Sequence, residues 1–385
     1  MASRLTATAA LLGLSALGYT SIIGLTARNG WGERFNEYNE RAVAVLPDTE
    51  IPARTHFTGV PGVDHIFVQA VKFFYPCVVG QLPALPLFSL YFAGQVIALH
   101  SLLVLEGLRL GNKGTIFAYT AIWGSLYQCV PFGITIPIYC ALYLWLSPLA
   151  KYSKGPKRIE SLSIESVQAF ATLPAIILGF VVPSALPALP SPRIVSLEQK
   201  QLFLIVWQFF PILVSISHRI FTVLAPKVGL VKASTTLAGK YDDAKEVYRQ
   251  VIYMAQISHI AVMTFVFIPQ AVQAVFKISD ISSINPFTVF LPMSIVSPRQ
   301  VTSMAEGALS LLQYDFYCGS AALLGLVSYL SGSAYGFTAG VWTATKILLK
   351  SLLVGPGAAL LWAFWDRDEE ALRDAGVEKS EKKDQ

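Results

Sequence analysis

Four acidic residues lie at the ends of apolar blocks in a chain that otherwise keeps charge out of such blocks: Asp64, Glu106, Glu306 and Asp315. An ionisable side chain at the edge of a membrane-length apolar segment is energetically costly, so each is a candidate functional residue. The chemistry that a desolvated carboxyl group offers is proton transfer. The structural alternative is that the carboxyl caps a helix or pairs with a neighbouring base.

Asp64 ends the stretch FTGVPGVD, in which two glycines and a proline predict a tight turn. It stands where a helix would begin, just before an apolar run, so an N-cap is the favoured interpretation. The functional alternative places its carboxyl at the mouth of a membrane cavity.

Glu106 and Arg109 close a long apolar block and are three residues apart, so they share a helix face and can form an ion pair. One interpretation is an interfacial pair that ends the span, with Gly111 as the helix C-cap. The other is a carboxyl that projects into a cavity and is oriented by Arg109. His100, a turn and a half earlier, is either a satisfied core histidine or a substrate contact.

Asp315 lies in a stretch rich in polar and aromatic residues that also contains Glu306, Tyr314 and Tyr317. This density favours a functional site over a capped, interfacial helix start. The small residues at 319–320 would let two helices approach closely.

The acidic pattern DDxxE at residues 242–246 has the shape of a Mg²⁺–diphosphate site. It falls in a lysine-rich stretch expected outside the membrane, and no second acidic motif accompanies it, so a solvated charged loop is the favoured interpretation. The cysteines and histidines show no metal-ligand spacing. The sequence therefore predicts no metal site.

The composition sets the fold class in which these residues must be positioned. Hydrophobic residues make up 54% of the 385 residues and charged residues 14%, against about 25% charged in soluble domains. The apolar residues form blocks close to the roughly 20 residues that a span needs. The sequence predicts an all-α, polytopic integral membrane helical bundle with about eight transmembrane helices. The net charge of +5 is spread over loops, which is not the pattern of a nucleic-acid-binding protein.

The apolar blocks and the segments between them divide the chain into four parts. Residues 1–27 are expected to form an N-terminal anchor or signal-like span, 28–65 a polar extramembrane segment and 66–365 the multi-span domain. Residues 366–385 are a charged tail, expected to be a frayed solvent-exposed helix or disordered. The expected spans after the first are, approximately, 66–80, 83–108, 116–146, 167–189, 202–224, 251–276, 316–330 and 340–364. The block 66–80 is short enough to be interfacial or re-entrant, and Pro131 and Pro137 bend or divide the block 116–146.

The basic loops 151–158 and 227–249 are expected on one side of the membrane, which the positive-inside rule makes cytosolic. With eight spans, the tail is expected on the other side. The sequence predicts a multi-pass integral membrane protein, located in the endoplasmic reticulum.

Three stretches of this chain resemble one known family: FTGVPGVDHIF at residues 57–67, SLYFAGQVIALHSLLVLEGLRLGNKG at 89–114 and AEGALSLLQYDFYCGSAALL at 305–324. They are similar to the membrane-bound terpene cyclases of fungal meroterpenoid pathways, of the ascochlorin, ascofuranone and macrophorin type. The resemblance covers most of the chain after the first span. It implies a reaction class, the proton-initiated cyclisation of a farnesylated precursor with or without a terminal epoxide, and no residue-level catalytic assignment.

Such a reaction needs a carboxylic acid that desolvation keeps protonated, a dry cavity, and aromatic faces that stabilise a carbocation. We expect Glu106 and Asp315 to be the acid and base, with Asp64 the next catalytic candidate. The expected substrate-binding residues are Arg109, His100, Tyr314, Tyr317 and Glu306. The expected partners are a hydrophobic prenylated small molecule and the lipid bilayer, without a cofactor and without nucleic acid.

Two other classes of function remain open from the sequence. One is a transporter or efflux component for a secondary metabolite, although many such proteins contain an internal repeat and none is detectable here. The other is a non-catalytic structural membrane subunit, in which the acidic residues would be satisfied interfacial caps.

Overall fold

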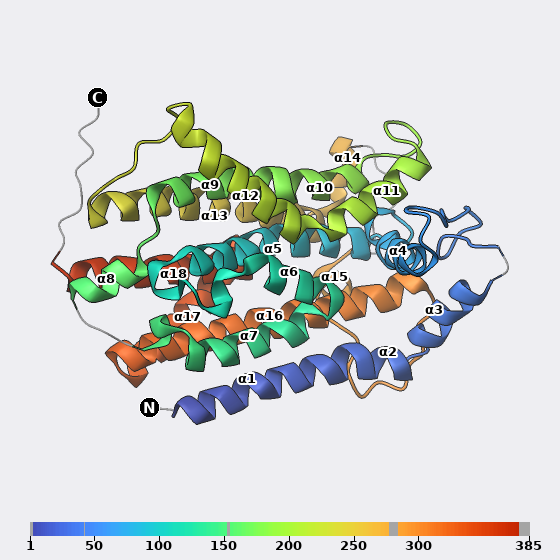
Figure 1. The fold of residues 1–385 in the computed structure, drawn as a ribbon. Helices are drawn as coiled ribbons and strands as arrows, with labels where there is room; N and C mark the ends of the chain where they lie inside the picture. Colours follow the sequence, from blue (N-terminus) through green and yellow to red (C-terminus); the bar gives the residue numbers. More distant parts are fainter. Residues whose placement is uncertain (1–2, 42, 152–154, 277–283, 377–385) are drawn as a thin grey trace.

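The computed structural model describes residues 3–41, 43–151, 155–276 and 284–376. Within these ranges every regular element is a helix, and the extended backbone contributes one isolated bridge between Val45 and Pro52. The helices lie lengthwise beside one another in a bundle (Figure 1). The predicted all-α helical bundle is therefore confirmed.

The helices are numbered here in chain order. Their bounds are α1 Arg4–Tyr19, α2 Leu25–Arg28, α3 Trp31–Glu40, α4 Pro61–Phe74, α5 Ala84–Leu108, α6 Thr120–Cys129, α7 Phe132–Leu146, α8 Pro156–Leu162, α9 Ser166–Ile176, α10 Val182–Ala185, α11 Leu197–Gln208, α12 Phe210–Lys227, α13 Leu237–Phe267, α14 Pro269–Phe276, α15 Pro286–Phe290, α16 Met304–Tyr335, α17 Phe337–Val354 and α18 Pro356–Asp374. Short π-helical turns join α1 to α2 and α9 to α10.

Among the described residues, five helices or continuous helical runs are long and apolar enough to cross a bilayer: Arg4–Arg28, Ala84–Leu108, Pro156–Ala188, Leu237–Phe267 and Phe337–Val354. The pair α11 and α12, bent by 69°, makes a sixth if it is one span. The predicted number of about eight is not confirmed. Two predicted spans are shorter helices here: 66–80 falls largely in the 14-residue α4, and 116–146 is divided between α6 and the 15-residue α7, next to Pro131.

Helix α5 is the centre of the bundle and contacts α9, α13, α16 and α18. It is apolar around its whole circumference, which is the pattern of a helix buried on all sides, and it is buried almost continuously from Gly94 to Gly107. Helix α7 packs between α1 and α16. The end of α5 is therefore enclosed by protein, and a charged side chain there must find its partners inside the bundle.

The last three helices form two tight helical hairpins. Gly336 joins α16 to α17 with φ +100°, and Gly355 joins α17 to α18 with φ +87°. These backbone conformations favour glycine because it has no Cβ. The hairpins bring the end of α16, most of α17 and α18 against one another.

The prediction that the tail is exposed is wrong for its first turns. Helix α18 continues through Asp374, and it buries Arg367, Asp368, Ala371 and Leu372 against other helices. The apolar pattern of α18 continues beyond residue 365 with charged residues at two inward positions. Residues 377–385 of the predicted tail lie outside the described part of the chain.

The end of α18 also corrects the predicted topology. Ile159 of α8, Tyr241 of α13 and Leu372 of α18 pack in one apolar cluster, and Arg158 pairs with Asp374 at 3.1 Å. The two basic loops and the end of α18 therefore lie at the same end of the bundle, the end of α8 in Figure 1. The prediction that they lie on opposite sides is wrong because the number of crossings between them differs from that assumed.

Candidate functional site

A network of buried charges lies where α5 ends against α18. It consists of Glu106 and Arg109 at the end of α5, and Arg367 and Asp368 of α18, and each of these side chains is at most about one-tenth exposed. Two carboxylates and two guanidinium groups thus share one interior site.

Glu106 is enclosed by hydrogen-bond donors. Its Oε1 accepts from Arg109 Nε at 2.5 Å and from Arg367 Nη2 at 2.6 Å, and its Oε2 accepts from the Tyr143 hydroxyl of α7 at 2.5 Å. The predicted pair of Glu106 with Arg109 is confirmed, and Arg367 is a second cation that the sequence analysis missed. All three partners can donate a hydrogen bond, and a carboxylate is a group that only accepts, so the arrangement suits a carboxylate.

Arg109 connects this carboxylate to the second one. Its Nη2 donates to Asp368 Oδ2 at 2.8 Å and to the Tyr248 hydroxyl of α13 at 2.6 Å, while its Nη1 donates to the Leu162 carbonyl of α8 at 2.5 Å. Tyr248 in turn donates to Asp368 at 3.0 Å. Arg109 is therefore a bridge among α5, α8, α13 and α18, and it is the helix C-cap of α5 in place of the predicted Gly111, which lies in the following 3₁₀ turn.

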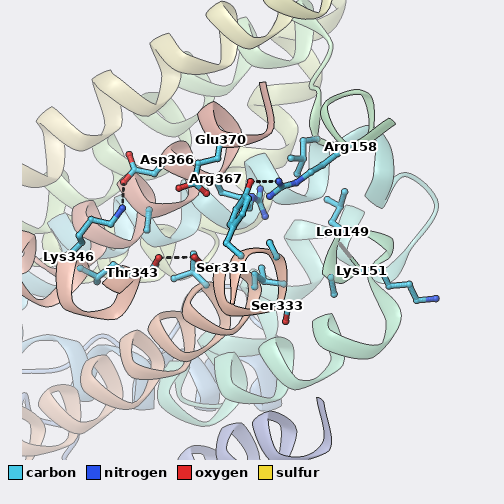
Figure 2. A pocket seen from close by; sticks show the side chains of 18 of the residues that line it. Leu149, Lys151, Arg158, Ser331, Ser333, Thr343, Lys346, Asp366, Arg367 and Glu370 are labelled. Carbon is cyan, nitrogen blue, oxygen red and sulfur yellow. Dashed lines mark hydrogen bonds and ion pairs between the residues drawn. The ribbon is translucent and has the colours of Figure 1, made fainter. Parts of the chain in front are cut away.

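A hollow lies beside this network, between α16, α17, α18 and the segments around α8. Its empty volume is about 870 Å³, part of which is open to solvent. Arg367 lines the hollow and also contacts Glu106, so the buried network forms one side of it (Figure 2).

The walls of the hollow differ in polarity. Apolar side chains that line it include Leu149, Leu162, Val327, Leu330, Ile347 and Ala363. Charged side chains that line it include Arg158, Lys346, Lys350, Asp366, Arg367 and Glu370. The hollow therefore offers apolar contacts on part of its wall and charged contacts elsewhere.

Asp315, the second predicted catalytic residue, lies elsewhere on α16. Its Oδ1 accepts a hydrogen bond from the backbone N–H of Gly133 at 2.7 Å, and its side chain is buried. Gly133 is in the first turn of α7, whose own cap residue is Pro131 and supplies no side-chain hydrogen bond. Asp315 thus serves from a neighbouring helix as a cap for α7, because it accepts from one of the backbone N–H groups that a helix leaves without a partner at its start.

Glu106 and Asp315 do not converge on one cavity. Phe316, next to Asp315, packs against Phe92 of α5, with tilted rings whose centroids are 5.2 Å apart. Glu106 is fourteen residues farther along α5, which corresponds to about 21 Å at 1.5 Å per residue. The expectation that this pair meets at one site is not met by the structure, and their individual catalytic roles stay predictions.

An aromatic cluster lies next to Asp315, with neighbouring ring centroids 5.0–6.5 Å apart. Its members are Phe88, Tyr91, Phe92, Phe132, Phe290, Phe316 and Tyr317. The predicted substrate contacts Tyr314 and Tyr317 donate their hydroxyls to the Met293 and Phe290 carbonyls, at 2.8 and 2.6 Å. These hydroxyls fasten the segment that precedes α16 onto it. The predicted close helix approach is also present, because the Phe132 ring lies against Gly319.

Asp64 holds the loop that precedes α4. Its carboxylate accepts from the backbone N–H groups of Phe57, Thr58 and Gly59 and from the Thr58 hydroxyl, at 2.7–3.2 Å. These hydrogen bonds, above all the one from the Thr58 backbone, hold the pKa of Asp64 below its usual range. The predicted N-cap is wrong in detail, since the cap residue of α4 is Val60, but the role of the carboxyl in this structure is a local structural one.

Glu306 is part of the cap at the start of α16. Its N–H donates to the Ser303 hydroxyl at 3.1 Å, its Oε2 accepts from the Thr302 N–H at 2.7 Å, and it pairs with Arg299. The structural interpretation of Glu306 is the one that the structure favours. Asp48, which the sequence analysis did not single out, accepts from the Met304 N–H at 2.9 Å and completes this cap.

His100 is buried in the middle of α5, with its Nδ1 2.7 Å from the Tyr127 hydroxyl. The rings of Tyr127, Phe180 and Phe210 surround it, with centroids 5.2–6.1 Å away. It does not line the hollow. A core histidine is therefore the simpler account of this residue.

The DDxxE pattern lies on a helix, not in the predicted loop, since residues 242–246 belong to α13. Glu246 pairs with Arg249, and Asp243 accepts from the Ser234 hydroxyl at 3.2 Å. In the described part of the chain, no three His, Cys, Asp or Glu side chains are grouped as metal ligands would be.

Three charged residues of α18 were not predicted: Arg367 and Asp368, which are buried, and Glu370, which lines the hollow. The spacing of apolar residues could have indicated that part of this charged run is buried. Residues 360, 361, 364, 371 and 372 continue one apolar helix face across the run DRDEE at 366–370. Charged residues at the inward positions of such a face are buried, and buried charges need partners of opposite sign. The pair of Glu106 and Arg109 was an available partner.

Comparison with known proteins extends over nearly the whole chain. The model of the CtvD domain matches residues 6–372. Curated relatives include a protein named terpene cyclase ascI from Acremonium egyptiacum, 28% identical over 93% of this chain and 90% of its own length, and one named terpene cyclase ctvD from Aspergillus terreus, 26% identical over 93% and 98%. A third, named terpene cyclase verU1, from Penicillium polonicum, is 30% identical over 82% of this chain and 80% of its own length.

No solved structure matches this chain significantly. The family resemblance found in three stretches of the sequence is confirmed by the match of the family model over almost the full length. The chain belongs to the CtvD domain family of fungal terpene cyclases.

Proposed function

We propose that this protein cyclises a farnesylated precursor, with or without a terminal epoxide, by protonating it inside the hollow beside α18. The observation that carries this proposal is the position of Arg367. It lines the hollow, and its Nη2 donates a hydrogen bond to Glu106 Oε1 at 2.6 Å. A buried network of four charges is costly to assemble. The positioning of a guanidinium group for substrate binding would explain why such a costly network is present.

The two kinds of wall suit the two parts of such a substrate. The isoprenoid chain would lie against Leu149, Leu330 and Ile347, which line the hollow, and exclude water from the reacting carbons. Its polar ring system would lie toward Lys346 and Arg367, where cationic donors favour phenolic or carboxylic oxygens.

The chemistry is an isomerisation and needs no cofactor. An acid O–H bond breaks as its proton reaches the terminal epoxide oxygen, whose ring then opens by breaking one C–O bond to leave a hydroxyl group, or the terminal alkene carbon. The π electrons of the chain then form new C–C bonds in sequence. The last carbocation loses a proton to a base, so the product has the composition of the substrate. General acid catalysis of this kind contributes about 10²–10⁴-fold to the rate.

Glu106 is better suited to positioning than to donating this proton, since its oxygens already accept from three donors. In this proposal it fixes the guanidinium of Arg367 toward the hollow. The proton must then come from a carboxyl group that itself lines the hollow, and two do so, Asp366 and Glu370.

The membrane environment supports the same assignment. A farnesylated substrate partitions into the bilayer, and the candidate spans include α17, which forms one wall of the hollow. The positive-inside rule would place this end, with its two basic loops, in the cytosol. We propose the endoplasmic reticulum membrane, and a fluorescent fusion imaged in a fungal host would test that location.

The activity is tested with purified protein in lipid nanodiscs and a set of farnesylated aromatic compounds, each with and without a terminal epoxide. The expected result is a product of unchanged mass and different retention that forms in proportion to enzyme. Correctly folded protein that leaves every compound of the set unchanged would contradict the proposed function.

A further inference from the structure

The hollow contains two carboxyl groups one turn apart on α18, and their surroundings differ. Asp366 lies between two ammonium groups, with its Oδ2 3.6 Å from Lys346 Nζ and 3.5 Å from Lys350 Nζ. Glu370 lines the same hollow, but no hydrogen bond or ion pair within 4 Å joins it to any other described side chain. A carboxyl group without a fixed partner is free to interact with a bound substrate.

Glu370 also lies on the same face of α18 as Arg367, because residues three apart in a helix are neighbours. Figure 2 shows the two side by side at the hollow. Arg367 is fixed by Glu106, so a substrate oxygen held by its guanidinium would be presented to the next turn of α18, where Glu370 stands. The network that positions Arg367 would in this way position the substrate for Glu370.

The charged groups around Glu370 come from three helices. They are Lys346 of α17, Arg158 of α8, and Asp366 and Arg373 of α18 itself. Burial is the largest influence and raises the pKa of Glu370, the cations Lys346, Arg158 and Arg373 lower it, and Asp366 raises it, with a net upward direction. Glu370 thus keeps its proton to higher pH than an ordinary glutamic acid.

We propose that Glu370 is the general acid that starts the cyclisation, which rests on the function proposed above. Its carboxyl O–H bond breaks and leaves a carboxylate, while the proton passes to the terminal epoxide oxygen, whose ring opens at one C–O bond, or to the terminal alkene carbon. The proton released by the last carbocation returns to that carboxylate, either directly or through water at the open side of the hollow. No oxidant, reductant or co-reactant is required.

The test compares Glu370→Gln with wild type and with Glu369→Gln, a matched change at the adjacent residue, which does not line the hollow. The probe is whichever farnesylated compound the wild type converts. Glu370→Gln should lower kcat by about a hundredfold or more, while equilibrium dialysis shows probe binding within about threefold of wild type. Glu369→Gln should leave kcat unchanged, and Glu370→Asp should recover part of the lost rate.

The pH profile gives a second readout that a structural role would not produce. Because the protonated form is active, wild-type kcat should fall as pH rises through the raised pKa of Glu370, and the residual activity of Glu370→Gln should lose this dependence. Folding of each variant is checked by its thermal transition in detergent.

Two outcomes would overturn the proposal. One is a kcat for Glu370→Gln within about threefold of wild type with an unchanged pH profile. The other is an equal loss in Glu370→Gln and Glu369→Gln, which would indicate a defect of α18 as a whole. A folded wild type that converts no probe would contradict the proposed function itself, and that result is distinguishable because it precedes any comparison of variants.

Discussion

Glu106 and Asp315 both have buried carboxyl groups at contacts between helices, but the groups that offset the cost of their burial differ. Glu106 receives two guanidinium groups and a phenol, and its network reaches a hollow. Asp315 receives one backbone N–H, from the first turn of α7. In the described residues no cation lies within 4 Å of the Asp315 carboxyl.

The difference separates two uses of a buried charge. A network with several partners fixes each member in one orientation, which is what the substrate-binding role proposed for Arg367 requires. A single carboxyl at a helix N-terminus satisfies backbone donors that the helix cannot satisfy itself. Carboxyl groups at similar positions, at the ends of apolar blocks, thus have different roles, and their hydrogen-bond partners distinguish them.

The largest effect should come from breaking the network at Glu106. Glu106→Ala leaves Arg109 and Arg367 with one fewer carboxylate, and removal of one partner of a buried pair costs about 3–5 kcal/mol. Thermal or denaturant unfolding in detergent should show this loss. The double variant Glu106→Gln with Arg367→Met should recover part of it, because it removes a charge of each sign; a double variant less stable than the sum of its single changes would contradict this account of the network.

A smaller effect is expected at Asp315. Asp315→Ala removes one capping acceptor, for which about 1 kcal/mol is typical, and Asp315→Asn should cost less because its amide oxygen can still accept from Gly133. Turnover of Asp315→Asn should stay close to wild type. Loss of turnover at an unchanged unfolding temperature would instead support the catalytic role that the sequence predicted for Asp315, and would place the reaction near the aromatic cluster.

The smallest effect is expected at Asp64, outside the bundle core. Because hydrogen bonds lower the pKa of Asp64, this residue stabilises the fold fully above the ordinary aspartate value, and the contribution is lost as pH falls through the lowered pKa. The unfolding temperature of wild type should therefore fall more steeply than that of Asp64→Asn as the pH is lowered below about 5. Parallel curves for the two proteins would contradict this role.

The sequence predicted the class of fold and one half of the network for clear reasons. Apolar blocks report burial directly, and the three-residue spacing of Glu106 and Arg109 defines a shared helix face. Arg367 and Asp368 were missed because spacing along one helix does not say which distant helix lies opposite. The partner of Asp315 is a backbone N–H of Gly133, which residue identity cannot indicate.

The proposed location of the substrate in the hollow is tested most directly by filling the hollow with a larger side chain. Ala334 of α16 lines the hollow, whereas Ala321, on the same helix and also half-buried, does not. With both variants folded, Ala334→Trp should lower kcat/KM for the converted probe by about a hundredfold, and Ala321→Trp should leave it near wild type. Full activity of Ala334→Trp would contradict the account, because the reaction would then take place elsewhere in the bundle.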